Sequence, residues 1–399
     1  MNIKSLLLGS AAAMVAVSGA QAADAVVVEA EPVEYVRVCD AYGSGFFFIP
    51  GTETCIRFGG FIRTTAGKID QTVTDAADGT VLLDDGAAVP VAITGEANSF
   101  VNRARLNIDT RNETDLGTLR GIFRLEAGDS NDPSATPVRA DVALVSLAGF
   151  RIGQNGGNYF TSNHGFAGVN LSAVTFTTEG FYGFDDSMVF DYTWAADGLA
   201  ITAGVENTTN ADLNGTIGGG NDIDYYAGFN YSADFGTVAF TAAHDTDALD
   251  PALDRGGWAY KVSLTLDLSE FIPGGTLHGF YMTDDDYATR YLNQAGQFLN
   301  VEEAYGVAFQ ANLTDEVELI GLWNRSEGSG GLAAAPGVDV EGDADIYTVG
   351  LNWFPSATPG FSIRAAYSHL EVEDTLNVVD DTLVDLEADA FEITLRRDF

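Results

Sequence analysis

Apolar and polar residues alternate along most of the chain, most clearly in its last twelve residues, "ADAFEITLRRDF", from Ala388 to Phe399. From Phe391 to Leu395 every second residue is apolar, and the chain ends on an apolar residue. Successive side chains of a β-strand point to opposite faces, so this period of two predicts a strand with one apolar face. The segment alone leaves open whether that face covers a protein core or contacts lipid.

Segments with the same alternation recur along the chain, and about sixteen of them can be counted. They are residues 56–62, 100–108, 119–125, 138–148, 150–153, 188–194, 199–205, 223–231, 238–244, 258–268, 277–283, 305–313, 317–323, 347–353, 361–367 and 391–399. Single-chain bacterial membrane barrels have an even number of antiparallel strands, and sixteen fits that rule.

The segments between these strands differ in length and character. Short ones lie at 115–118, 195–198, 232–236 and 355–360, and long, acidic ones at 70–95, 207–221, 284–300, 327–342 and 371–388. Short turns at one end and long loops at the other are typical of outer-membrane barrels. The pattern therefore predicts an all-β fold: a transmembrane antiparallel β-barrel of about 16 strands with short periplasmic turns and long extracellular loops.

The N-terminus carries the features of a secretory signal peptide. One positive charge, Lys4, precedes an apolar run at 6–17 and the small-residue triplet Ala20-Gln21-Ala22. This order predicts cleavage after Ala22 and export; an uncleaved anchor is the alternative, but the apolar run is short and interrupted. The expected organisation is a cleaved signal peptide at 1–22, an N-terminal segment leading into the barrel at 23–54, and the barrel at 55–399.

Composition and charge narrow the class further. The 399 residues include 45 Gly, 25 Phe and 15 Tyr, which suits a glycine- and aromatic-rich β protein. The net charge of −39 becomes −40 when Lys4 leaves with the signal peptide, so nucleic acid is a poor partner.

The chain has two cysteines, Cys39 and Cys55. In an exported protein an even, closely spaced pair predicts one disulfide bond. Two free, buried thiols are the alternative.

No motif points to catalysis, so an enzyme is not expected, nor is a cofactor or a metal site. His164, His244, His278 and His369 are scattered and none has the spacing of metal ligands. Nucleophile elbow, P-loop and dinucleotide motifs are absent from the sequence.

The acidic loops raise the question of calcium. The stretch "DTDALD" at 245–250 lacks the Gly and Glu that an EF-hand loop requires. Loose binding of divalent cations at Asp284, Asp285 and Asp286, or bridging through them to lipopolysaccharide, stays open beside a simple solvated loop.

Positive charge is unevenly distributed. Ten of the eighteen basic residues that remain after signal cleavage lie between Arg57 and Arg151, and none lies at 152–254. Six arginines on the first three predicted strands alternate out of phase with the apolar residues: Arg57, Arg63, Arg103, Arg105, Arg120 and Arg124. They are expected to share the lumen side of one wall, where they would polarise the passage. In a soluble sheet they would be solvated surface charges.

The stretch "VCDAYGSGFFFIPGTETCIRFGGFIR", Val38 to Arg63, closely resembles the N-terminal signature of alphaproteobacterial outer-membrane porins of the rhizobial and brucella type. The signal peptide, the length and the terminal Phe399 fit the same family. The resemblance implies a sixteen-stranded, trimeric general-diffusion channel whose third loop folds into the pore. Arg397 departs from the family pattern, because it occupies the apolar face two residues before the end, and it is expected near the rim.

By the same resemblance, residues 153–183 form the inward-folded loop. It has one acid, Glu179, with Asp185 and Asp186 just beyond, and these acids are expected to face the arginines across the constriction.

The function expected is that of an outer-membrane porin, a water-filled passive channel for small hydrophilic solutes and ions with a weak cation preference. Its partners would be two further copies of the chain, outer-membrane lipid and lipopolysaccharide, and Phe399 would act as an assembly signal in the closing strand. An exported adhesin or binding protein without a pore is the alternative, in which the same alternation would face a dry core.

Overall fold

A computed structural model describes residues 37–75, 81–82, 88–89, 93–128, 138–157, 159–163, 187–208, 223–246, 257–284, 299–330, 341–376 and 383–399. The predicted signal peptide lies outside these residues. So do Asp285 and Asp286.

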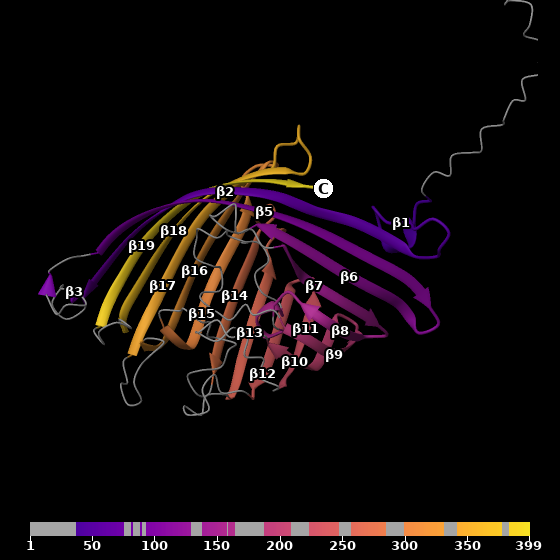
Figure 1. The fold of residues 1–399 in the computed structure, drawn as a ribbon, viewed down its shortest axis with the longest axis horizontal. Coiled ribbons are helices and arrows are strands. Elements are labelled where there is room, and N and C mark those ends of the chain that lie inside the picture. The colour runs from indigo at the N-terminus through magenta and orange to yellow at the C-terminus, as the bar shows by residue number, and fades with distance from the viewer. Residues whose placement is uncertain are drawn as a thin grey trace, which may run out of the picture.

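Within the described residues, sixteen antiparallel strands form a closed barrel (Figure 1). The first eight are β2 (Cys55–Asp75), β5 (Ile93–Thr114), β6 (Gly117–Gly128), β7 (Val138–Leu147), β8 (Phe150–Asn155), β9 (Ser187–Ala196), β10 (Leu199–Thr208) and β11 (Asp224–Ala233). The others are β12 (Gly236–Asp245), β13 (Gly257–Asp267), β14 (Thr276–Asp284), β15 (Leu299–Asn312), β16 (Val317–Gly330), β17 (Glu341–Trp353), β18 (Phe361–Leu376) and β19 (Leu383–Asp398). Each pairs with its neighbours in sequence, and β19 pairs with β2 to close the ring.

The predicted fold class is confirmed, and each predicted segment overlaps one strand. The long loops are shorter than predicted, however, because β2 continues to Asp75 and β19 begins at Leu383. At the start of β19 the exposed positions carry acids, Glu387 and Asp389, whereas Leu386 and Ala388 are buried on the inner face. The apolar residues thus change face beyond the apolar band, so backbone pairing continues where the alternation no longer matches the rest of the strand.

The two faces of each strand differ in the way a membrane barrel requires. On β2, Ile62 is 58% exposed, whereas its neighbours Phe61 and Arg63 are 5% and 6% exposed. On β19 the apolar Ile393 is exposed and the polar Glu392 is buried. A soluble sheet buries its apolar face, so this inverted arrangement identifies the outer face as the one that contacts lipid.

Exposed aromatic residues gather near both ends of the strands. Trp194 and Trp353 lie next to short turns, and Trp258 and Tyr225 lie at the opposite ends of their strands. Such belts mark the two interfaces between lipid and water.

Small elements accompany the barrel. They are η1 (Asp40–Tyr42), β1 (Phe47–Phe48), the pair β3 (Val81–Leu82) and β4 (Ala88–Val89), and α2 (Tyr159–Ser162). In the described part of the chain no helix is long and apolar enough to cross a membrane.

The predicted disulfide joins Cys39 to Cys55, with 6.0 Å between the two Cα atoms. It ties η1 and β1 to the start of β2, at the end of the barrel where the turn between β5 and β6 lies (Figure 1). Inside this segment Phe46 is buried, and the guanidinium carbons of Arg57 and Arg111 lie 4.8 and 4.9 Å from the centre of its ring. The segment is therefore attached to the barrel both covalently and through cation–π contacts.

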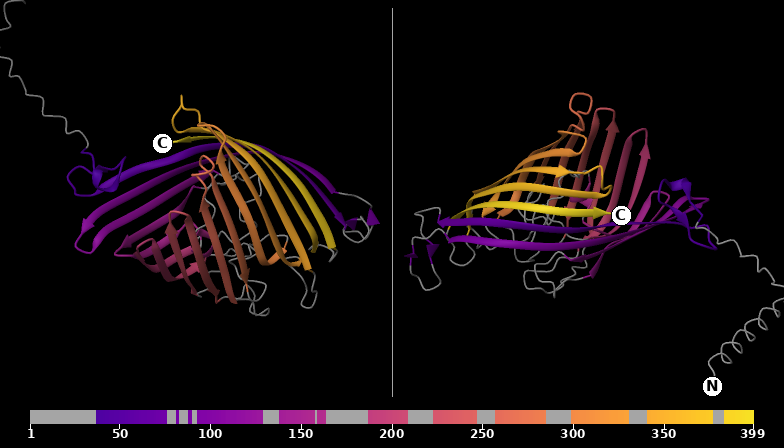
Figure 2. Two further views of the ribbon diagram at one scale, coloured as in Figure 1. Left: turned by 180° about the vertical axis from the view of Figure 1, so that it is seen from behind. Right: turned by 90° about the horizontal axis from the view of Figure 1, so that it is seen from above.

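The last residue belongs to the seam between the first and last strands (Figure 2). The Phe399 backbone N–H donates to the Gly60 carbonyl at 3.1 Å, and the Gly60 N–H donates to the Phe399 carbonyl at 3.0 Å. A Cβ atom on Gly60 would lie 2.0 Å from the Arg105 carbonyl oxygen, so only glycine allows this close approach. Arg397 donates to the Pro359 carbonyl in the short turn between β17 and β18, which puts it at the rim.

Candidate pore wall

Eight arginines project from the inward face of β2, β5, β6 and β7. They are Arg57, Arg63, Arg103, Arg105, Arg111, Arg120, Arg124 and Arg139. The six arginines predicted from the alternation are among them, and all six lie on the face opposite the exposed apolar one. We call this group the arginine wall.

Buried carboxylates hold the arginine wall in place. Asp109 accepts hydrogen bonds from Arg111 and Arg120, with ion-pair distances of 2.8 and 2.9 Å, and Arg57 approaches it to 3.6 Å. One carboxylate thus fixes three guanidinium groups, one from each of β2, β5 and β6.

Glu126 and Asp141 repeat the arrangement farther along the strands. Glu126 contacts Arg105 directly and lies 3.8 Å from Arg103 and 3.4 Å from Arg139. Asp141 binds Arg124 at 2.8 Å. Glu113 of β5 shares the phase of Arg111 and accepts a hydrogen bond from Tyr42 near the turn to β6. Four carboxylates therefore face eight guanidinium groups among the described side chains of these four strands, and the inner face keeps an excess of positive charge.

The acids were missed from the sequence, although a signal for them exists. On β5, Asp109 lies an even number of residues from Arg103, Arg105 and Arg111, so these side chains point to one face. On β6, Glu126 stands in the same relation to Arg120 and Arg124. A search for acids in phase with the arginines would have found both.

The segment after β8 turns into the barrel. The Tyr159 ring stacks on Tyr226 at 4.4 Å between centroids, and the Tyr159 backbone N–H donates to Glu206 at 3.0 Å. Asn163 donates to Thr241 at 2.7 Å. These contacts join α2 to the inner faces of β10, β11 and β12.

A glycine makes room for this segment. A Cβ atom on Gly228 of β11 would lie 2.7 Å from the Phe240 carbonyl, 3.1 Å from the Tyr159 hydroxyl and 3.2 Å from the Asn163 amide. In a ring of sixteen strands β12 is eight strands from β2 in either direction. At the other edge of the arginine wall, β7 is only three strands from β10, so the start of the inward segment packs across the barrel from β2 and β5. Glu179, Asp185 and Asp186 lie outside the described residues.

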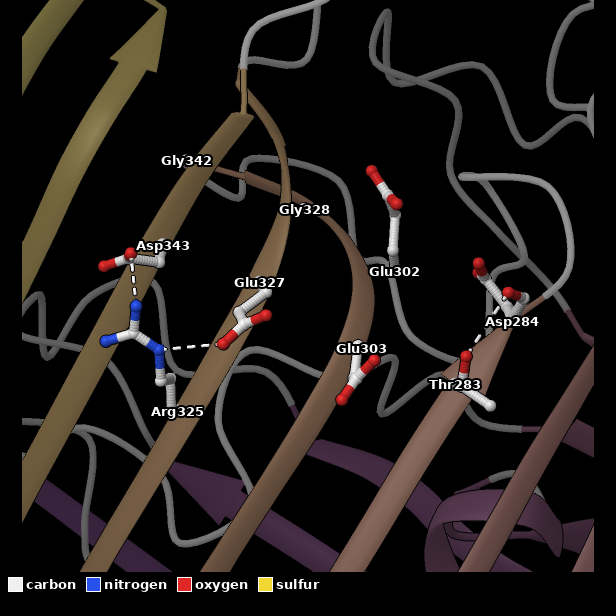
Figure 3. A pocket seen from close by; sticks show the side chains of 9 residues that line it. All are labelled: Thr283, Asp284, Glu302, Glu303, Arg325, Glu327, Gly328, Gly342 and Asp343. Carbon is white, nitrogen blue, oxygen red and sulfur yellow. Dashed lines mark hydrogen bonds and ion pairs between the residues drawn. The ribbon is translucent and has the colours of Figure 1, made fainter.

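A second polar region lies at the long-loop ends of β14 to β17 (Figure 3). It is a cavity of about 550 Å³ lined by Thr283, Asp284, Glu302, Glu303, Arg325, Glu327, Gly328, Gly342 and Asp343. Arg325 binds Glu327 at 2.9 Å and also contacts Asp343. Among the described residues no group of three or more His, Cys, Asp or Glu side chains is arranged to hold a metal ion.

The family model described as porin subfamily matches residues 24–392. The chain belongs to this porin subfamily. Porin Omp2b of Brucella abortus (strain 2308) is 36% identical over 296 residues, which span 68% of this chain and 71% of the relative, and Porin Omp2b of Brucella suis biovar 1 (strain 1330) is equally similar. The protein is thus an outer-membrane porin that forms a diffusion channel, and the prediction that it is not an enzyme is confirmed.

Solved structures share the fold at low sequence identity. The outer membrane channel DcaP of Acinetobacter baumannii aligns with a TM-score of 0.62 and 13% identity, over 88% of this chain and 99% of that one. The anion-selective porin from Comamonas acidovorans aligns with a TM-score of 0.57 and 12% identity, over 87% of this chain and 100% of that one. OmpT of Vibrio cholerae in its trimer form aligns with a TM-score of 0.51 and 12% identity, over 87% of this chain and 100% of that one. At these identities the likeness concerns the barrel architecture.

Proposed function

We propose that this porin carries small hydrophilic solutes and ions through a lumen whose passage is polarised by the arginine wall. The observation that carries the proposal is the imbalance on β2, β5, β6 and β7, where eight guanidinium groups face four carboxylates among the described side chains. Buried carboxylates fix the guanidinium groups of the wall, so their charge stays at a defined place instead of moving on flexible side chains. A fixed charge beside a narrow aqueous path acts on every ion that passes.

The inward segment supplies the opposite side of the proposed constriction. Its first turn packs on β10, β11 and β12, across the ring from β2 and β5 of the arginine wall, which supports an approach of Glu179, Asp185 and Asp186 to the same lumen. Acids facing arginines across a wet gap create a transverse field, which orients dipolar solutes and separates the paths of cations and anions.

The net selectivity proposed is a weak preference for cations. The chain carries a net charge of −39, which draws cations toward the channel, and the arginine wall opposes this attraction at the narrow part. Charges farther than a Debye length of about 8 Å from the path are screened in physiological salt, so the local arginines limit the preference.

The porin is also proposed to assemble as a trimer embedded among outer-membrane lipid and lipopolysaccharide. The trimer form of the Vibrio cholerae relative supports a ring of three. The small residues Gly60 and Ala104 lie on the lipid-facing side of β2 and β5, where they allow close packing with a second barrel.

The selectivity is tested by replacing Arg103 and Arg105 with glutamine and measuring the zero-current potential across a potassium chloride gradient. One unit charge about 7 Å from an ion in water changes its energy by about 0.6 kcal/mol, roughly a threefold change in partition. The double variant is therefore expected to raise the cation-to-anion permeability ratio by about that factor or more. Arg139 still pairs with Glu126 at 3.4 Å in the variant, so this carboxylate keeps a partner.

Arg37→Gln is the matched control, because Arg37 is exposed and pairs with the exposed Glu53 outside the barrel strands. It is expected to leave the potential unchanged. An unchanged potential in the folded Arg103→Gln, Arg105→Gln variant would show that these arginines lie away from the constriction.

A further inference from the structure

A buried aromatic ring lies on the lumen side of β2, where the surrounding wall is polar. Phe61 is 5% exposed, and in the strand register it stands between Arg105 of β5 and Asp398 of β19. Among the described residues it belongs to none of the clusters of buried apolar side chains. An apolar side chain on the wet face of a barrel needs a different kind of cover.

Arginines from three neighbouring strands cover the ring. The guanidinium carbon of Arg396 on β19 lies 4.2 Å from the centre of the Phe61 ring. The corresponding distances are 5.1 Å for Arg105 on β5 and 5.8 Å for Arg63 on β2. A cation within about 6 Å of a ring centre is attracted by the π electrons, and the planar, weakly hydrated guanidinium group stacks well on such a face. One ring thus links three strands across the seam.

The same guanidinium groups also have carboxylate partners. Arg105 donates through Nε to Glu126 at 2.5 Å, and Arg396 donates to Asp398 at 2.6 Å. The buried Glu392 attracts the third group. The ring therefore adds to the counter-charge and does not replace it. A carboxylate holds one edge of a guanidinium group and the ring holds its plane, so the two contacts together fix position and orientation.

The stacked groups lie against the wall of the lumen. The side chain of Arg105 is 20% exposed and that of Arg396 is 36% exposed, although both belong to the face that lines the channel. An arginine that extended into the lumen from either position would bring its charge nearer to the passing ions and would narrow their path.

We propose that Phe61 is a positioning residue for ion selectivity. Its ring keeps the guanidinium groups of Arg63, Arg105 and Arg396 flat against the wall, and this sets the distance between their charges and the ions in the lumen. The inference rests on the proposed function, because it concerns ions that pass through the channel. It adds a side chain without charge or polar group to those that determine selectivity.

Loss of the ring is expected to change selectivity although the number of charges stays the same. In Phe61→Leu the three groups lose the cation–π attraction, and the space left by the ring lets them move. Three charges that each move from about 10 Å to about 7 Å from an ion in water change the partition of that ion by about twofold. The cation-to-anion permeability ratio should therefore fall by about twofold. The single-channel conductance should fall too, because the side chains narrow the path.

The experiment measures the zero-current potential of the purified porin in planar bilayers across a potassium chloride gradient at low salt, where screening is weak. Phe123→Leu on β6 is the matched control, because it removes the same ring from the lipid-facing side, where Phe123 is 37% exposed. It should match the wild type. Phe61→Tyr keeps the aromatic face and should also keep the wild-type potential.

A second background shows whether the ring acts through its arginines. Arg396 has the shortest of the three distances to the ring, so in Arg396→Gln the Phe61→Leu substitution should shift the potential less than it does in the wild type. If Phe61→Leu does not fold, Phe61→Met replaces it in both backgrounds, because methionine is a flexible apolar side chain that fills space without an aromatic face.

Two results would overturn the role of Phe61 and leave the proposed channel intact. One is a folded Phe61→Leu porin with the potential and conductance of the wild type, even if its midpoint of thermal unfolding is lower, since the ring would then only stabilise the seam. The other is an equally large shift in the Arg396→Gln background. A folded wild-type barrel without ion current contradicts the proposed function itself.

Discussion

At the scale of single residues, charge in this porin is organised by a few buried acids. Asp109 and Glu126 each gather three arginines, so the positions of six guanidinium groups depend on two carboxylates. Removing either acid would release three positive charges into the lumen and leave them to repel one another.

At Gly60 the neighbouring strand leaves no room for a side chain, so a single substitution tests this close packing. In Gly60→Ala the new methyl group meets the Arg105 carbonyl oxygen at 2.0 Å, so the paired backbones of β2 and β5 must move apart. Overpacking of this kind costs about 1–3 kcal/mol. The expected result is a lower midpoint of thermal unfolding, read from the heat-modifiable mobility of the protein in gels.

Gly321→Ala on β16 is the control, because a Cβ atom there has no neighbour within 4 Å among the described residues. It should leave the midpoint unchanged or raise it slightly, since alanine loses less entropy on folding. Equal midpoints for the two variants would contradict the close approach at Gly60.

At the scale of elements, the segment closed by the disulfide is stabilised separately from the barrel. Closing a loop of this size contributes about 3 kcal/mol in the chain-entropy model. Replacing Cys39 and Cys55 with serine is expected to leave the barrel folded and to expose residues 37–54 to protease. Peptide mapping after brief digestion measures this, and two free thiols in the non-reduced wild-type protein would contradict the bond.

The strands could be predicted from the sequence because contact with lipid requires apolar residues on one face of each strand, and this produces the alternation. Residues such as Ile62 and Ile393 face an apolar solvent, and their neighbours face water or charge, so each strand shows its two faces locally. The long-loop ends of β2 and β19 could not be predicted, since there the inner face carries apolar residues such as Leu386 and the outer face carries acids, which reverses the pattern of the membrane-spanning part.

The partners of the arginines depend on register, which alternation does not reveal. Asp141 reaches Arg124 through a register shift between β6 and β7, so no fixed spacing in the sequence predicts this ion pair. The inward turn at Tyr159 has no periodic pattern and was expected only from the family resemblance. The opposed Arg63 and Arg396 are far apart in sequence and become neighbours only when the ring closes.

At the scale of the whole molecule, Phe399 contributes both to the seam and to the lipid interface. Its deletion removes two backbone hydrogen bonds to Gly60 and an exposed ring, and each bond is worth about 0.5–1.5 kcal/mol. Synthesis and export should continue while the yield of folded barrel in the outer membrane falls, as measured by heat-modifiable mobility of membrane fractions.

Two substitutions separate these contributions. Phe399→Tyr keeps the backbone bonds and an aromatic ring and should assemble normally, whereas Phe399→Ala keeps only the backbone bonds. Normal assembly of the deletion variant would show that the seam does not depend on its last residue.

The seam also determines the order in which the chain can fold. The hydroxyls of Thr65 and Thr394 lie 2.8 Å apart although 329 positions separate them in sequence. Until β19 has been made, β2 keeps an open edge with unpaired N–H and C=O groups, and the exposed apolar faces of all strands remain in water. A barrel closed in this way cannot complete itself strand by strand during synthesis, so the finished chain must be kept from aggregating on its way to the membrane by something other than its own fold.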